Sequence, residues 1–160
     1  MLHKEDFVRG NRQMESKNLS LSIVAALLAA IIGGAMWAFI AILTEYEIGL
    51  LAWAIGGMTG YAVILLAKNN VTMVHQVIAV IASLIGILLG KYFMFGYYYN
   101  ESFSGIFDNE VMTIFGENFS AFFGGMDIIF VLLAVVTAWK LPGKHVNNEI
   151  KMEQTIDSLE

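Results

Sequence analysis

The stretch LSLSIVAALLAAIIGGAMWAFIAIL, residues 19–43, decides the fold class of this chain. None of its 25 residues carries a charge, and a helix needs about 20 apolar residues to cross the hydrocarbon core of a bilayer. The apolar core of a cleaved signal peptide is shorter, about 7–15 residues, and ends at a small-residue cleavage site. No convincing site of that kind follows this stretch. The sequence therefore predicts an uncleaved transmembrane helix here.

Three further segments are long and apolar enough to cross a bilayer, at residues 48–67, 77–96 and 119–139, and two of them contain one charged residue each. Charged residues make up 14% of the 160-residue chain and hydrophobic residues 58%, whereas a soluble domain carries about 25% charged residues. Lipid offers the backbone no hydrogen-bond partners, so spanning segments must be helices, and these uninterrupted apolar runs lack the alternation of a transmembrane barrel. We expect an all-α, membrane-embedded four-helix bundle over residues 19–142, with Pro142 ending the fourth helix.

The basic residues predict the orientation of the bundle. Residues 1–18, the connector 68–76 and the residues from Lys140 onward together hold eight of the nine Lys and Arg residues. The turn at 44–47 and the loop at 97–118 hold none. Cytoplasmic loops carry the excess of Lys and Arg, so we expect both termini in the cytoplasm of a bacterial cell and the bundle in its inner (cytoplasmic) membrane. Residues 1–18 then form a cytoplasmic N-terminal segment, and residues 143–160 a polar cytoplasmic tail.

Aromatic residues and one short helix are expected at the outer interface. Trp37, Trp53 and the tyrosines at 97–99 are placed as in the aromatic belt of a membrane surface. In the loop 97–118, apolar residues between Ile106 and Phe115 fall near one helical face. This pattern predicts a short amphipathic helix in the interface, between the third and fourth spans. Its role is either a lid or partner surface, or a plain connector that settles on the bilayer.

Glycine recurs along all four spans, as adjacent pairs or at a spacing of four residues. Small residues one helical turn apart let helix backbones approach closely, which is the main source of packing energy between helices in lipid. The glycines either pack helices tightly or leave thin surfaces around a small cavity or pore. The glycines that we assign to helix packing are Gly33, Gly34, Gly56, Gly57, Gly60, Gly86, Gly90, Gly124 and Gly125.

Residues suited to catalysis or metal binding are scarce. The chain has no cysteine, which excludes disulfides and thiolate sites. His3, His75 and His145 lie in separate segments, without an HExxH motif or a histidine pair at helical spacing. No nucleophile has a base within reach by spacing, and the basic residues form no patch for nucleic acid. We therefore expect no catalytic residue, no metal, no cofactor, no nucleic-acid partner and no enzymatic activity.

Two charges inside the apolar spans are the strongest candidates for a functional site. Lys91 lies in GILLGKYFMFGYYY, residues 86–99, and Asp127 lies near the start of the fourth span. With a rise of about 1.5 Å per residue, both fall at similar depth in the outer half of the membrane. A charge near the bilayer centre costs at least about 2.5–3.5 kcal/mol, so such residues face the bundle and find partners. We expect Lys91 to pair with Asp127, with Glu45 or Glu47 of the outer turn as a competing partner. In the alternative, Lys91 extends to the outer headgroups and Asp127 bonds to a helix terminus or to water.

Two stretches of the chain resemble a known group of proteins. GGAMWAFIAILTEYEIGLLAWAIGGMTGYAV, residues 33–63, is similar to the first hairpin of small bacterial integral membrane proteins without an assigned function, and MDIIFVLLAVVTAWKLP, residues 126–142, is similar to their last span. The resemblance is carried by the glycines, the Glu-Tyr-Glu turn and the aspartate near the start of the fourth span. It implies a four-helix membrane protein and says nothing about activity.

Three classes of function stay open at this point. The intramembrane charges and glycine-lined spans favour a small transporter or channel-like subunit. The small size and the scarcity of catalytic groups favour a non-catalytic membrane partner or assembly factor that acts through helix contacts. An intramembrane enzyme comes third. The partners expected are the lipid bilayer and either a second copy of the chain or another membrane protein.

Overall fold

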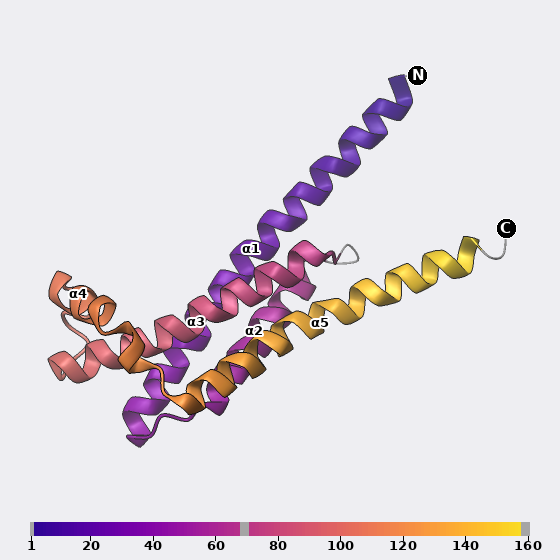
Figure 1. Ribbon diagram of the computed structural model, residues 1–160. Helices are drawn as coiled ribbons and strands as arrows, with labels where there is room; N and C mark the ends of the chain where they lie inside the picture. Colours follow the sequence, from indigo (N-terminus) through magenta and orange to yellow (C-terminus); the bar gives the residue numbers. More distant parts are fainter. Residues whose placement is uncertain (1, 68–70, 158–160) are drawn as a thin grey trace.

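The computed structural model describes residues 2–67 and 71–157, and within these ranges it describes side chains from residue 18 to residue 144. Every regular element in the described residues is a helix. Four stretches are long and apolar enough to cross a membrane, which confirms the all-α, four-span fold class: Asn18–Thr44, Leu50–Ala67, Met73–Asn100 and Gly125–Lys144. In chain order the helices are α1 (Leu2–Thr44), α2 (Leu50–Ala67), α3 (Met73–Asn100), α4 (Asn109–Glu117), the 3₁₀ helix η1 (Phe119–Phe122) and α5 (Gly125–Asp157) (Figure 1).

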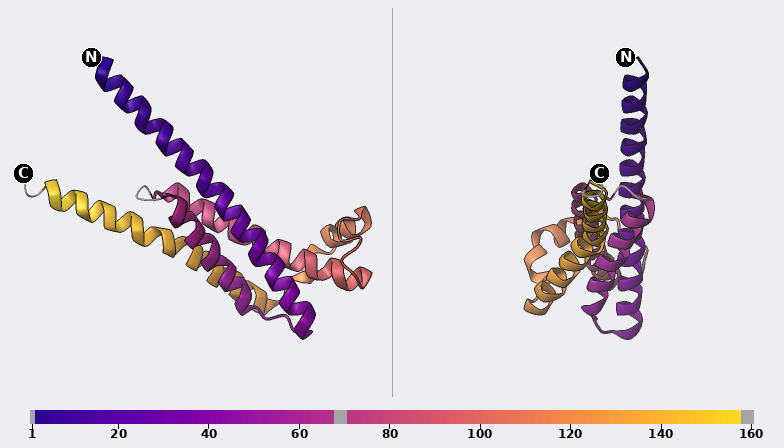
Figure 2. Two further views of the ribbon diagram at one scale, coloured as in Figure 1. Left: turned by 180° about the vertical axis from the view of Figure 1, so that it is seen from behind. Right: turned by 90° about the vertical axis from the view of Figure 1, so that its right-hand side faces the viewer.

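The helices α2 and α3 form the centre of the bundle. α1 packs against both of them, α5 packs against both of them as well, and α4 contacts α3. Figures 1 and 2 show both termini at the same end of the bundle, where α1 and α5 continue beyond the other helices. The turn between α1 and α2 lies at the opposite end, together with α4. We call the first the terminal end, and the second, with residues 45–49 and 101–124, the α4 end.

The buried face of α1 shows how the helices pack. Its buried residues recur every three or four positions, from Ser22 through Ala26 and Ala30 to Trp37 and Ala41. Large aliphatic side chains cover the rest of the spanning part and are exposed in the bundle. Small residues therefore face neighbouring helices and large residues face outward, as expected for a helix surrounded by lipid.

Glycine brings α1 and α3 into backbone contact. A Cβ atom on Gly34 would lie 2.5 Å from the carbonyl oxygen of Gly86, and a Cβ atom on Gly86 would lie 2.9 Å from the carbonyl oxygen of Ala30. A Cβ atom on Gly90 would lie 2.8 Å from Cε3 of Trp37. Atoms of the neighbouring helix occupy the space where a side chain would lie at each of these glycines. At this contact the glycines therefore pack helices and do not line a cavity.

The contact between α2 and α5 is built in the same way. A Cβ atom on Gly56 would lie 2.3 Å from the carbonyl oxygen of Ala134, and one on Gly60 would lie 3.3 Å from the side chain of Leu141, closer than most Cβ contacts. One turn before Gly56, Trp53 Nε1 donates a hydrogen bond of 2.7 Å to Oγ1 of Thr137. Backbone contact and one polar link thus fix α5 against α2.

Three of the predicted packing glycines have no such role. A Cβ atom on Gly57 or Gly125 would meet no atom within 4 Å, and one on Gly124 would meet only Asp127, at 3.6 Å. Gly57 lies next to the packing glycine of its pair but points away from the contact, because adjacent residues in a helix face about 100° apart. Gly33 does pack, since its Cβ would lie 3.0 Å from the side chain of Ile55.

The fourth spanning helix begins later than the predicted segment 119–139. Residues Phe119–Phe122 form the short η1, and α5 begins only at Gly125. Asp127 Oδ2 accepts a hydrogen bond of 2.7 Å from the backbone N–H of Gly124, which caps the helix at this point. Hydropathy does not separate residues 119–124 from the span, because both stretches are apolar.

Pro142 does not end the fourth helix. It is buried inside α5, which continues to Asp157. Proline lacks an N–H and leaves a carbonyl one turn earlier without its helical donor, and such gaps in membrane helices are filled by groups from neighbouring helices. The carbonyl that Pro142 leaves without its helical donor is that of Ala138. Gln76 of α3 donates to the next carbonyl along the helix, that of Trp139, with its Nε2 3.2 Å from the oxygen.

Trp37 is not part of an interfacial belt. Its side chain is 2% exposed and packs in the core between α1 and α3. The missing side chain of Gly90 leaves room for the indole ring there. Trp53 and Tyr98, by contrast, are exposed on the surface of the bundle.

The segment between the third and fourth spans contains more helix than a plain connector. α3 continues to Asn100, and α4 covers Asn109–Glu117 with Val111 buried. Phe95 of α3 lies 5.9 Å from Phe115 of α4, measured between ring centroids. A short helix is therefore present where the amphipathic pattern predicts one, while its position in the membrane interface stays a prediction.

Candidate functional site

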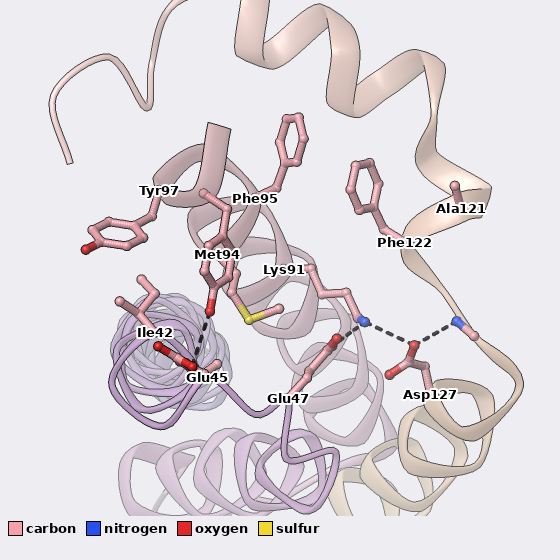
Figure 3. Close-up of a pocket in the computed structure, with 13 residues that line it drawn as sticks. Ile42, Glu45, Glu47, Lys91, Met94, Phe95, Tyr97, Ala121, Phe122 and Asp127 are labelled. Atoms are coloured by element: carbon pink, nitrogen blue, oxygen red, sulfur yellow. Dashed lines mark hydrogen bonds and ion pairs between the residues drawn. The ribbon is translucent and has the colours of Figure 1, made fainter. Parts of the chain in front are cut away.

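The side chain of Lys91 is the centre of the candidate site. It projects from α3 and is 3% exposed. Its Nζ lies 3.0 Å from Oδ2 of Asp127 and also donates to Oε1 of Glu47 (Figure 3). One buried ammonium is therefore bonded to two carboxylates that come from two other parts of the chain.

Local structure fixes the position of each carboxylate. Asp127 stands in the first turn of α5, where the same oxygen that binds Lys91 caps Gly124, and a negative charge is favoured at a helix N-terminus. Glu47 stands in the turn after α1, two residues beyond Glu45, whose φ of 58° lies in the left-handed region. Gly49 holds this turn against α5, because a Cβ there would lie 2.2 Å from the ring of Phe130.

Two aromatic rings complete the surroundings of the ammonium. Nζ of Lys91 lies 5.9 Å from the ring centroid of Trp37 and 5.3 Å from that of Phe123. At these distances the negative ring faces attract a cation. The ammonium is thus held by charge from two carboxylates and by two rings, and these contacts offset the cost of placing it in an apolar environment.

The cluster contains more negative than positive groups, and its negative groups are the more exposed. One ammonium faces two carboxylates, which gives a formal net charge of −1 with all three groups ionised. The side chains of Glu47 and Asp127 are 37% and 18% exposed, while that of Lys91 is nearly closed off. The negative groups therefore face outward from the cluster and the positive group lies beneath them.

A pocket of about 900 Å³ lies over this cluster. Lys91, Glu47 and Asp127 all border it, and Glu45 adds a further carboxylate. Aromatic and apolar residues form much of the remaining wall, among them Phe95 of α3 (Figure 3). Phe122 of η1 borders the pocket as well, and its ring lies 4.8 Å from that of Phe95. The pocket belongs to the α4 end and joins an acidic floor to an aromatic wall.

The structure brings together most of the charged residues that the sequence singled out. Lys91 and Asp127 lie side by side, and Glu47 binds Lys91 at the same time as Asp127 and does not compete with it. Glu45 borders the pocket without a bond to Lys91 among the contacts described. The competing-partner interpretation is therefore replaced by a three-membered cluster.

Sequence reasoning missed the aromatic part of the site. The sequence pattern places Trp37 at the membrane surface and gives Phe123, near the start of the predicted span 119–139, no role, yet both rings lie near the ammonium. A signal was present for Trp37, because it continues the spacing of Ala26, Ala30 and Gly34 along the inward face of α1. No comparable signal marks Phe123, whose position depends on where α5 begins.

A second set of buried polar residues lies along α3. His75, Gln76 and Ser83 are buried on the same helix as Lys91. His75 Nδ1 lies 3.1 Å from the backbone N–H nitrogen of Thr72, where it caps the start of α3. Within the described part of the chain, no group of three or more His, Cys, Asp or Glu residues is placed to hold a metal ion.

Comparison of the chain with protein-family models, with curated proteins and with solved structures finds no match.

Proposed function

We propose that this chain is a small transporter or channel-like subunit of a bacterial cytoplasmic membrane, and that the pocket over Lys91 is its external binding site. The observation that carries this proposal is the buried cluster of Lys91, Glu47 and Asp127 at the floor of the pocket. Ionisable residues inside membrane spans are costly and commonly mark the path of an ion or a substrate.

The distribution of charge supports an orientation with the α4 end outside and both termini in the cytoplasm. Eight of the nine basic residues lie in residues 1–18, in the connector 68–76 or from Lys140 onward, and Lys91 is the ninth. The α4 end carries acidic residues at positions 45, 47, 101, 108, 110 and 117. Basic loops stay on the cytoplasmic side, so the pocket opens to the outside in this orientation. In this placement α4 lies in the outer interface with Val111 toward the bundle.

Accessibility labelling tests the orientation. Cysteines introduced at Glu45 and Asp108 react with a membrane-impermeant thiol reagent in intact cells, while cysteines at Asn70 and Asn147 react only after the membrane is opened. The chain contains no cysteine of its own, so each label reports a single position. The reverse pattern at either pair of sites would overturn the orientation.

Vesicle flux tests the activity. The full-length protein is reconstituted into lipid vesicles, and uptake of small cations, anions and zwitterions is compared with uptake into empty vesicles. We expect uptake of at least one solute, abolished by Asp127→Asn and retained by Glu117→Gln, an exposed acid of α4 away from the pocket. Uptake equal to that of empty vesicles for every class of solute would contradict the proposal.

The burial of the spans favours an assembly of more than one chain. The apolar window of the α5 span is 17% buried, against 33–39% for the other three spans. A second copy of the chain or another membrane protein against α5 would raise this fraction. Crosslinking from Leu132, an exposed residue of α5, tests this expectation in native membranes; crosslinked species no larger than one chain would contradict it.

One observation favours a second candidate function, a non-catalytic membrane partner or assembly factor. α1 begins 16 residues before its spanning part, and α5 continues 13 residues beyond its own. Both extensions project at the terminal end (Figure 1) and offer helical surface to a cytoplasmic protein. Co-purification of a second polypeptide in a fixed ratio, lost when residues 145–160 are removed, together with absence of flux, would favour this function over transport.

A further inference from the structure

An ammonium group already occupies the floor of the pocket, and it belongs to the protein itself. Nζ of Lys91 is bonded to Glu47 and Asp127 and faces the rings of Trp37 and Phe123. Two carboxylates and two ring faces are a set of contacts that suits an organic cation. The site therefore contains an intramolecular example of the group that it can bind.

The exposure of the three charged groups decides the sign of a ligand that enters from the pocket. Such a ligand meets Glu47, which is 37% exposed, and Asp127, which is 18% exposed, before it reaches Lys91 at 3%. Glu45 borders the same pocket, which adds a further negative charge. An anion would have to pass these carboxylates to reach the ammonium beneath them, whereas a cation is attracted to the groups that it meets first.

The walls of the pocket favour an organic cation over a metal ion. A hard metal cation needs several oxygen ligands in a compact shell, and the described residues contain no group of three or more acidic or histidine side chains so placed. The pocket instead presents Met94, Phe95 and Phe122 beside its carboxylates. Its volume of about 900 Å³ lies within the range of about 300–1,000 Å³ found for small-molecule sites.

We infer that the pocket binds a protonated amine with an apolar or aromatic substituent, whose ammonium competes with that of Lys91 for Glu47 and Asp127. The inference rests on the proposed function, because it names the ligand of the same external site. In the ligand-free protein Lys91 neutralises part of the acidic floor. When the amine binds, its ammonium takes over one or both carboxylates and its substituent lies against the aromatic wall.

Binding to the full-length protein in detergent tests this inference with three probes that share a phenylethyl group and differ in charge. The probes are 2-phenylethylammonium, its neutral counterpart 2-phenylethanol and the anion 3-phenylpropionate. Heats of binding are measured by titration at constant ionic strength, with protein-free micelles as the blank. We expect saturable 1:1 binding of the ammonium probe and affinities at least about tenfold weaker for the other two, because a site built for a charged group discriminates against analogues without it. Equal binding of all three probes would overturn the inference.

Three variants then separate the pocket from general attraction to an acidic surface. Glu47→Gln should weaken binding of the ammonium probe by at least about tenfold, because it removes a charged partner. Glu117→Gln, with an exposed acid of α4 outside the pocket, should leave binding unchanged. Lys91→Met should tighten binding of the ammonium probe by at least about tenfold, because the probe then no longer competes with the Lys91 ammonium for the two carboxylates.

The sign of the Lys91→Met effect is the sharpest criterion. Weaker binding in this variant, or equal losses in Glu47→Gln and Glu117→Gln, would overturn the inference. Should Lys91→Met fail to fold, the three-probe comparison on the unaltered protein and the Glu47→Gln variant still decide the question. Binding of the ammonium probe without its uptake into vesicles would contradict the transporter and leave the inference intact. Uptake of another solute without such binding would contradict the inference alone.

Discussion

In the middle of the bundle the helices touch backbone to backbone through glycine and alanine, while at the α4 end ion pairs and aromatic rings join them. Gly34 meets Gly86, and Gly56 meets Ala134, at distances that leave no room for a side chain. Around Lys91 the contacts are instead between long side chains that border a pocket. The first region has no room for added volume, whereas the second borders open space. Backbone packing and the proposed binding pocket are therefore located in separate parts of this small bundle.

The largest effect is expected where backbones touch. Gly56→Leu places a side chain where even a Cβ atom would lie 2.3 Å from the carbonyl oxygen of Ala134. We expect a loss of more than about 3 kcal/mol in free energy of unfolding, at the upper end for overpacked cores, or failure of the bundle to assemble. Thermal unfolding in detergent measures it.

The matched control lies one residue along the same helix. Gly57→Leu adds the same side chain where no atom lies within 4 Å, and leucine favours a helix more than glycine does. We expect a change within about 0.5 kcal/mol, as for surface positions. Equal damage by the two variants would show that leucine harms α2 for a reason other than contact with α5.

The next effect concerns the buried cluster. Lys91→Met leaves Glu47 and Asp127 next to each other without their cation, and removing one partner of a buried pair costs about 3–5 kcal/mol. The loss is expected at the lower end, about 3 kcal/mol, because Glu47 is partly exposed.

A double-mutant cycle tests whether Lys91 and Asp127 are coupled. The combination of Lys91→Met with Asp127→Asn removes one of the two facing negative charges, so we expect it to recover about 1 kcal/mol of the loss predicted from the single changes. The readout is unfolding in detergent for the four proteins of the cycle. Strict additivity would show that the two groups act independently.

The smallest effect separates the two glutamates of the turn. Glu47→Gln weakens a charge-assisted hydrogen bond to Lys91 at a partly exposed position and should cost about 0.5–1 kcal/mol. Glu45→Gln changes an acid of the same pocket that has no bond to Lys91 among those described, and should cost less than about 0.3 kcal/mol. The two melting temperatures, compared at low and high salt, check the order. A larger loss of stability in Glu45→Gln than in Glu47→Gln would indicate that Glu45 is the partner of Lys91.

Much of the architecture was open to prediction from the sequence. The number of spans, their helical nature and the presence of a short helix between the third and fourth spans follow from apolar length and periodicity, which do not depend on neighbours. The bounds were less certain. Residues 119–124 are as apolar as a span, and only the bond from Asp127 to the backbone of Gly124 sets the start of α5. Pro142 was a reasonable helix stop by local rules, yet α5 continues through it to Asp157.

The candidate site was predictable in part for the same reason. Lys91 and Asp127 could be matched because a charge in an apolar span needs a partner, and a constant rise per residue gives its depth. The simultaneous bond to Glu47 could not be derived, because it depends on how the turn at 45–49 folds over α3 and α5. The rings of Trp37 and Phe123 were hidden by composition, since aromatic residues are equally common at membrane surfaces and in cores.

By itself the sequence determined that this chain forms four apolar helices with basic segments at one end and a charge pair toward the other. Those properties are set by the solvent around each segment and are local. Only the tertiary structure decided which glycine of a pair contacts a neighbouring helix, as Gly56 does and Gly57 does not. It also decided that one lysine binds two carboxylates beneath a pocket. These depend on the rotation of each helix about its own axis, which an apolar sequence specifies only through the fit of all four helices together.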